Sequence, residues 1–150
     1  MRAVIQRVSS ASVTIDQQKT CFIEKGLLIL LGIESNDTQD DIDWLCNKII
    51  HLRIFNDQDG TMNCSASDID AQLLVVSQFT LFAKTKKGNR PSYIKAAPAS
   101  ISIPLYQSFI SSIQKLSKQK VETGQFGADM KIDLTNDGPI TIMIDTKNKE

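Results

Sequence analysis

The stretch "QLLVVSQFTLFA", residues 72–83, carries the strongest strand signal of the chain. Its first half is rich in leucine and valine, which suits a strand buried on both faces. The run then passes into a polar tetrad, Ser77-Gln78-Phe79-Thr80, which we expect to continue the strand. Because ligands gather where the strands of an α/β sheet end, this point is the first candidate for a functional site.

Strands are predicted on both sides of this stretch. Residues 2–15 read as two short alternating strands around a Ser-Ser turn. The segment "GLLILLGI", residues 26–33, is apolar on both faces, as a central strand is. From Val121 onward the pattern is strand, Gly-rich turn, strand, Gly-Pro, strand.

Two helices are predicted between the strands. Thr38 is placed to cap the first, and Asp41, three residues on, completes a capping-box spacing. The second follows from apolar residues at helical spacing over 101–116, where Pro104 either opens the helix or kinks its first turns. No repeat or low-complexity segment divides the chain, so we predict a single α/β domain over residues 1–150.

The composition describes a globular protein without a global charge bias. The 150 residues are 41% hydrophobic and 23% charged, with 17 basic and 17 acidic side chains, so a polyanion must be met by a local patch. The longest apolar run is too short to span a bilayer, and the alternating N-terminus lacks a signal-peptide core, so no membrane partner is expected. Three scattered cysteines favour a reducing compartment, and we predict a cytoplasmic protein.

Most familiar catalytic motifs are missing from the sequence. The single histidine, His51, follows the apolar face of the first helix and is interpreted as structural. Lone His and scattered Cys do not supply a zinc site, and no G-x-S-x-G, P-loop or G-x-G-x-x-G motif occurs, so neither metal nor cofactor is expected. If the protein is an enzyme, its substrate is already activated or brings part of the catalytic machinery.

The tetrad and the loop after it leave two interpretations open. Ser77–Thr80 deliver hydroxyls, an amide and backbone N–H groups that could stabilise an oxyanion, but the tetrad taken alone favours the alternation of a half-exposed strand. The following loop, residues 84–93, concentrates positive charge within seven residues. Such a cluster attracts nucleic acid, or else it is a solvated loop. Its four cationic side chains are Lys84, Lys86, Lys87 and Arg90.

A Gly-Pro pair near the C-terminus has no obvious structural purpose. In "TNDGPITI", residues 135–142, Asn-Asp-Gly alone supplies ordinary hairpin-turn chemistry. Proline lacks a backbone N–H and is excluded from central strands, so Pro139 needs another explanation.

The chain closely resembles the D-aminoacyl-tRNA deacylases. The resemblance rests on "MRAVIQRV", "GLLILLGI", "LRIFND", "LLVVSQFTL", "KGNRPSY", "TGQFGADM" and "NDGPITI", which occur in family order over essentially the whole length. The two signature motifs, Ser-Gln-x-Thr at 77–80 and Gly-Pro at 138–139, are both intact.

The resemblance implies a fold, a reaction and a set of site residues. It implies a curved, barrel-like mixed sheet flanked by two main helices, and a homodimer with active sites at the interface. Ser77, Gln78, Phe79 and Thr80 would form the catalytic segment that polarises the ester carbonyl. We expect Thr80 to position substrate, since no base is available to activate it; attack by its hydroxyl is the alternative. Gly138 and Pro139, joined by a cis peptide bond, would receive the α-ammonium group in the partner's pocket and reject L-amino acids. Lys84, Lys86, Lys87 and Arg90 would contact tRNA phosphates.

Two other functions remain open at the level of sequence. The chain could be a binding module of this fold that captures tRNA 3′ ends without hydrolysing them. It could also act on glycine attached to a non-cognate tRNA, because a pocket that rejects L side chains sterically does not exclude glycine.

Overall fold

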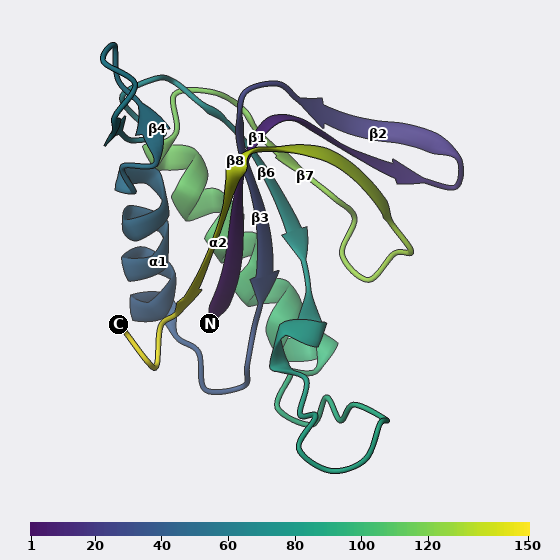
Figure 1. Cartoon of the computed structure of the whole chain (residues 1–150). Coiled ribbons are helices and arrows are strands. Elements are labelled where there is room, and N and C mark those ends of the chain that lie inside the picture. Colours follow the sequence, from purple (N-terminus) through teal and green to yellow (C-terminus); the bar gives the residue numbers. More distant parts are fainter.

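A computed structural model describes residues 1–150, apart from the side chain of Lys19. The elements form one α/β domain in which two helices flank a strongly curved sheet (Figure 1). In chain order they are β1 (Arg2–Ile15), β2 (Gln18–Ile23), β3 (Gly26–Gly32), α1 (Gln39–His51), β4 (Phe55–Asn56), β5 (Met62–Cys64), β6 (Gln72–Ser77), the 3₁₀ turn η1 (Phe79–Phe82), α2 (Ala99–Leu116), β7 (Val121–Thr123) and β8 (Lys131–Asp145).

The long strand β1 organises the sheet. Strands β2 and β3 pair antiparallel with successive halves of one edge of β1, and β8 follows the other edge along nearly its full length. Beyond β3 the sheet continues with β6 and β7, both in parallel pairing, so the sheet is mixed. Because β1 curves, its second half, with β2 and the start of β8, folds over the sheet into a partly closed barrel (Figure 1).

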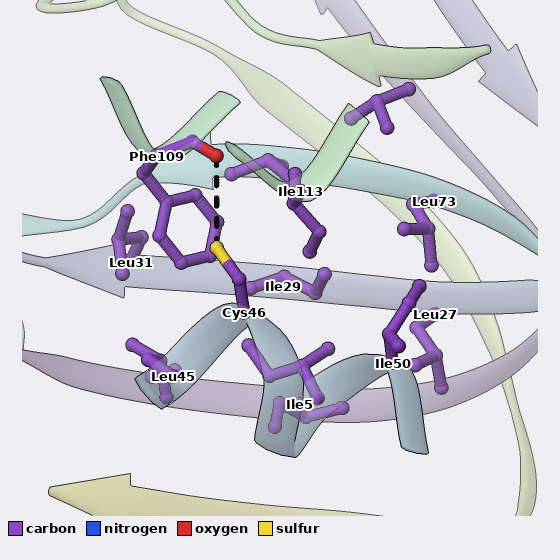
Figure 2. Close-up of a cluster of buried hydrophobic side chains, with 14 of the residues drawn as sticks. Ile5, Leu27, Ile29, Leu31, Leu45, Cys46, Ile50, Leu73, Phe109 and Ile113 are labelled. Atoms are coloured by element: carbon purple, nitrogen blue, oxygen red, sulfur yellow. Dashed lines mark hydrogen bonds between the residues drawn. The ribbon is translucent and has the colours of Figure 1, made fainter. Parts of the chain in front are cut away.

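This curvature explains why the central strands are apolar on both faces. One face of β3 and β6 packs against both helices in the larger core (Figure 2). The other face, which includes Leu28 and Leu74, packs against the curled half of β1 and against β2. In the larger core the thiol of Cys46 on α1 donates a hydrogen bond to the carbonyl oxygen of Phe109 on α2, 3.8 Å away.

Local sequence signals account for the helix boundaries. The expected capping box of α1 is present: Asp41 accepts hydrogen bonds from the backbone N–H and the hydroxyl of Thr38. Helix α2 begins at Ala99, and Pro104 lies inside the helix rather than opening it. Because proline has no backbone N–H, the helix lacks the hydrogen bond that residue 104 would otherwise donate to the carbonyl of Ser100, four residues earlier.

The structure differs from the sequence prediction at three points. Residues 2–15 form one strand without a turn, because Ser10 pairs with Thr135 of β8. The tetrad does not continue β6 as a strand: after Ser77 the chain turns into η1. The Gly-Pro pair does not separate two strands but lies within β8 as an irregularity in its pairing with β1.

The first and last strands meet at the start of α1. The α-ammonium group of Met1 forms a buried ion pair with Asp37 and donates a hydrogen bond to the hydroxyl of Thr146, 2.7 Å away. Lys147 reaches the carboxylate of Asp41 at 2.7 Å. Within the described residues, no helix has the length and apolar character needed to cross a bilayer.

Candidate functional site

A cavity of about 370 Å³ opens where β3 and β6 end. Five segments line it: the ends of β3 and β6, the start of α2, the loop from Phe126 to Met130, and β8 at Ile132. Ser77, Gln78 and Phe79 of the tetrad belong to the lining. The volume lies in the range typical of small-molecule sites, so the strand end that the sequence singled out does border a ligand-sized space.

The tetrad presents unused hydrogen-bond donors at this cavity. The backbone N–H of Gln78 still continues the sheet, donating to the carbonyl of Leu31 at 2.7 Å. The next two N–H groups, of Phe79 and Thr80, donate none of the backbone hydrogen bonds found across the described chain. They stand free because η1 begins here, and the first N–H groups of a helical turn have no partner within it.

Thr80 has a different position from its three neighbours. It does not line the cavity, and its hydroxyl accepts a short hydrogen bond from the side-chain amide of Gln78. This bond fixes the Gln78 side chain over η1. The turn is further held by Gly32 beneath it, where an added Cβ would lie 3.1 Å from the carbonyl oxygen of Gln78.

The cavity contains little that could act as a strong acid or base. Asp129 is the one ionisable side chain in its lining, and it is paired with Lys131 at 3.0 Å. No cluster of three or more potential metal ligands occurs among the side chains that the structure describes. His51 is exposed on the last turn of α1, outside the cavity lining. The chemistry available here is therefore hydrogen bonding from backbone donors.

A buried tyrosine supports the cavity from the side of α2. The Tyr106 hydroxyl donates to the carbonyl of Val75 at 2.9 Å, and its ring meets Phe126 of the lining edge-on with centroids 5.5 Å apart. Burial raises the pKa of Tyr106 well above its usual value, so the hydroxyl stays neutral and keeps its proton for this bond.

The four cations of the predicted basic loop follow the tetrad closely in sequence. Lys84, Lys86, Lys87 and Arg90 are all exposed, and none takes part in a salt bridge within the described structure. The loop begins two residues after η1 and is closed by reciprocal hydrogen bonds between the backbones of Lys84 and Ser92.

Gly138 and Pro139 form an exposed protrusion on β8. Their peptide bond is cis, as expected, and Gly138 has φ +134°, a conformation that favours glycine. The side-chain oxygen of Asn136 accepts the N–H of Ile140 at 2.8 Å and so closes the protrusion. The pairing of β8 with β1 is irregular opposite this protrusion, between Gln6 and Val8.

A buried arginine anchors this protrusion from below. Arg7 of β1 is 7% exposed, and its guanidinium donates to the carbonyl of Asp137 at 3.0 Å and to the carbonyl of Ile54 at 2.6 Å. It also reaches the Asn56 side chain at 3.3 Å and the Asp137 carboxylate at 3.4 Å. One charged group thus ties β8 to the segment after α1.

The protrusion and the tetrad lie far apart within one chain. The strand pairing gives their separation. Gly138 lies near the level of Arg7 of β1, and Arg7 pairs with Leu27 of β3. Ser77 of β6 pairs with Leu31 of β3, four residues further along that strand. Four residues along the strands correspond to about 13 Å, and the three strand spacings between β8 and β6 to about 14 Å. The structure does not bring Gly138 and Pro139 together with Ser77–Thr80 of the same chain.

Two parts of this arrangement were missed by reasoning from residues. Phe126–Met130, which form one wall of the cavity, belong to a Gly-rich segment without periodicity or a motif of known chemistry. Arg7 could have been found from the sequence. It lies two residues after Ile5 and four after Ala3, so on an alternating strand it places a charge on the same buried face. A charge at such a position requires partners.

The fold and the cavity define a class of protein: a single-domain, half-closed α/β barrel whose cavity offers backbone donors. The family model described as D-Tyr-tRNA(Tyr) deacylase matches residues 4–145, and the chain belongs to this family. Proteins named D-aminoacyl-tRNA deacylase from Flavobacterium johnsoniae and from Bacteroides fragilis strain YCH46 are each 61% identical over 150 residues, with full coverage of both chains.

Solved structures support the same fold. A structure titled "c-Myc DNA Unwinding Element Binding Protein" superposes with a TM-score of 0.92 at 38% identity, covering 97% of this chain and 98% of the other. A structure described as a probable eukaryotic D-amino acid tRNA deacylase gives a TM-score of 0.82 at 15% identity, covering 95% and 97%. At that identity, the second likeness concerns the fold alone.

Proposed function

We propose that this protein hydrolyses the ester bond of D-aminoacyl-tRNA, releasing the D-amino acid and free tRNA. The observation that carries the proposal is the free N–H group of Phe79, a residue that lines a ligand-sized cavity in a chain of the deacylase family. The activity in the names of its relatives fits this geometry, because an aminoacyl ester is reactive and needs polarisation more than a strong nucleophile.

In the proposed reaction the terminal adenosine occupies the cavity and the ester carbonyl meets the free N–H groups. Water adds to the carbonyl carbon, the negative charge on the carbonyl oxygen is held by the Phe79 N–H, and the ester C–O bond breaks. The proton lost by the attacking water passes, with the neighbouring ribose hydroxyl assisting, to the departing ribose oxygen, which leaves as a hydroxyl group. Thr80 acts through Gln78, whose side chain it holds, because its hydroxyl is bonded to that amide, which is not a base that could activate it.

Chiral selection is assigned to Gly138 and Pro139. Their carbonyls would receive the α-ammonium group of the amino acid while leaving no room for a side chain of L configuration. A D-amino acid or glycine has no side chain on the excluded side, so both can bind. We therefore expect deacylation of glycine on a non-cognate tRNA to accompany the main activity. Arg7 is a positioning residue for this filter, because it holds the backbone of Asp137 immediately before Gly138.

Since Gly138 is far from the tetrad within one chain, we propose a homodimer in which each protrusion completes the partner's site. The outer edge of β8 supports this arrangement: it pairs with no strand in the described residues. The strand also exposes Leu134 and, at 73% exposure, Met143. An open edge with exposed apolar side chains is a surface that proteins normally cover.

The remaining assignments follow from the substrate. The four cations of the basic loop would contact tRNA phosphates, which gives affinity with little sequence selectivity. All three cysteines are free in the structure, which fits a reducing compartment, and we assign the protein to the cytoplasm.

One preparation tested on D-, L- and glycyl-tRNA pairs decides the proposal. We expect loss of the ester from the D- and glycyl-tRNA and an intact L-ester. Binding of all three without hydrolysis would establish the alternative, a module that captures tRNA 3′ ends.

A glycine substitution tests the filter itself. In Gly138→Ala the new Cβ would lie 2.8 Å from Cγ1 of Ile140 and 3.2 Å from Nη2 of Arg7, so the protrusion must shift and D-ester turnover should fall. Gly60→Ala is the matched control: Gly60 also has positive φ, at +81°, but no atom lies within 4 Å of the added Cβ. Equal activity of the two variants would remove Gly138 from the site.

A further inference from the structure

Two aromatic rings form an exposed surface at the rim of the cavity. Phe79 and Tyr93 meet edge-on with ring centroids 5.0 Å apart and an interplanar angle of 76°. Phe79 is 56% exposed and Tyr93 is 38% exposed, although rings of this size are usually covered. We refer to these two side chains as the aromatic shelf.

The shelf lies between the cavity and the basic loop. Phe79 lines the cavity, and Tyr93 directly follows Ser92, whose backbone closes the basic loop against Lys84. In Figure 1 this loop, between β6 and α2, projects away from the body of the molecule. A flexible chain that leaves the cavity toward the loop therefore passes over the shelf.

The chemistry of this path matches a single strand of nucleic acid. Aromatic side chains stack on unpaired bases, and a neighbouring group of free cations follows the phosphates. The four loop cations are exposed and form no ion pair in the described structure. An apolar protein partner would account for the rings but not for four unpaired charges beside them.

We propose that the aromatic shelf is a binding site for the unpaired nucleobase immediately 5′ of the terminal adenosine. This rests on the proposed function, which places the terminal adenosine in the cavity. The base stacks on the rings of Phe79 and Tyr93, and the phosphates that follow it run toward the basic loop. The shelf contributes to binding of the RNA end and leaves the ester bond to the backbone donors.

The test compares two small substrates that differ only in the two nucleotides 5′ of the terminal adenosine. One is a D-aminoacyl ester of adenosine, and the other is the same ester on the trinucleotide CCA. Because stacking of one base on an aromatic side chain corresponds to about 5- to 150-fold in affinity, Tyr93→Leu should lower kcat/KM on the trinucleotide by that factor more than on adenosine. The loss should appear in KM.

Two control variants separate stacking from general damage to the loop. Tyr93→Phe keeps the ring and should retain the advantage of the trinucleotide. Ile94→Ala removes an adjacent apolar side chain that is 81% exposed but has no ring, and it should behave as wild type. An equal loss on both substrates in Tyr93→Leu, or the same loss in Ile94→Ala, would overturn the proposal.

A binding measurement keeps the result independent of catalysis. In an amide-linked CCA analogue, 2-aminopurine replaces the base next to the terminal adenosine, and its fluorescence should be quenched by wild type and by Tyr93→Phe but not by Tyr93→Leu. If the wild-type protein hydrolyses neither ester but quenches the fluorescence of the probe, the proposed function is refuted while the shelf is supported as a base-binding site. Absence of quenching, or a change from dimer to monomer sedimentation in Tyr93→Leu, would refute the shelf as a base site.

Discussion

Replacing Arg7 by methionine removes a buried guanidinium while keeping an apolar side chain of similar length. Two backbone carbonyls lose their donors: that of Asp137 at 3.0 Å and that of Ile54 at 2.6 Å. Asn56 also loses a contact at 3.3 Å. These bonds join the segment before Gly138 to the segment after α1, and the variant loses this connection.

The expected cost is large because the group is buried. A hydrogen bond from a charged group typically contributes about 1.5–3 kcal/mol, and Arg7 donates to two carbonyls, so its loss should cost about 3–6 kcal/mol. For a domain of this size each kcal/mol lowers Tm by about 2–4 °C, so Arg7→Met should melt about 6–24 °C below wild type. Circular dichroism measures this shift, and hydrogen exchange at residues 136–140 should show that the protrusion has lost protection.

Arg53→Met is the matched control for this experiment. Arg53 is exposed and makes one hydrogen bond, from Nε to the carbonyl of Asn63 at 2.8 Å, so its loss should cost about 1 kcal/mol. If Arg7→Met melts as close to wild type as Arg53→Met does, with unchanged exchange at 136–140, the anchoring role of Arg7 is refuted.

Four further outcomes are expected. Thr80→Ala should retain measurable deacylation, because the hydroxyl holds Gln78 and does not attack the ester. Complete loss of turnover with fold and tRNA binding intact would instead favour Thr80 as a nucleophile. Full activity in the presence of a chelator is the companion test for the absence of a metal. Neutralising two cations of the basic loop should flatten the log–log salt dependence of tRNA binding by about 0.7–0.9 per lost contact, and an unchanged slope would make it a solvated loop. Burial alone would raise the pKa of Asp41, but its hydrogen bonds, foremost that from Lys147, hold this pKa below the usual 3.8. Asp41 therefore stabilises the fold above pH 3.8, and this contribution is lost as the pH falls further. The free energy of unfolding of Asp41→Asn should be lower than that of wild type at pH 7, by a difference that shrinks in acid; a difference independent of pH would contradict this. Burial raises the pKa of Cys46 to about 12, so a thiol reagent at pH 8 should label the partly exposed Cys64 first and Cys46 only on unfolding, as peptide mass spectrometry would show.

Features governed by neighbours in sequence were predictable. The capping box of Thr38 and Asp41 depends on three residues of spacing, and the two-sided apolar pattern of residues 26–33 reflects burial of β3 on both faces. The turn after Ser77 was not predictable, because η1 is seated on Gly32, which is 45 residues away in sequence. The Ser-Ser pair was misread as a turn for the same reason, since its partner Thr135 belongs to the last strand.

The residues of the candidate site also fall into two groups, those marked by local sequence and those placed by contacts between distant segments. Ser77–Phe79 were found because they follow a strong strand signal, and the cations of the basic loop because they cluster in sequence. The cavity wall at Phe126–Met130 was known only as part of a resemblance, since its place opposite β6 is set by the parallel pairing of β6 with β7. The anchoring of the Gly-Pro protrusion by Arg7 required the β1–β8 register.

The pairing of β1 with β8 also bears on how the chain acquires its structure. Arg2 lies opposite Asp145, so this ladder joins segments separated by almost the whole chain, and Gly138 takes its place only within it. Contacts of such long sequence separation form late and slow the folding rate, because the entropy of closing the intervening loop is lost before the contacts form. During synthesis, β3, α1 and β6 emerge before β8, which leaves one edge of β1 uncovered until the final segment arrives. The proposed filter is thus the last part of the molecule to be assembled, and a chain stalled before residue 138 would carry the tetrad without it.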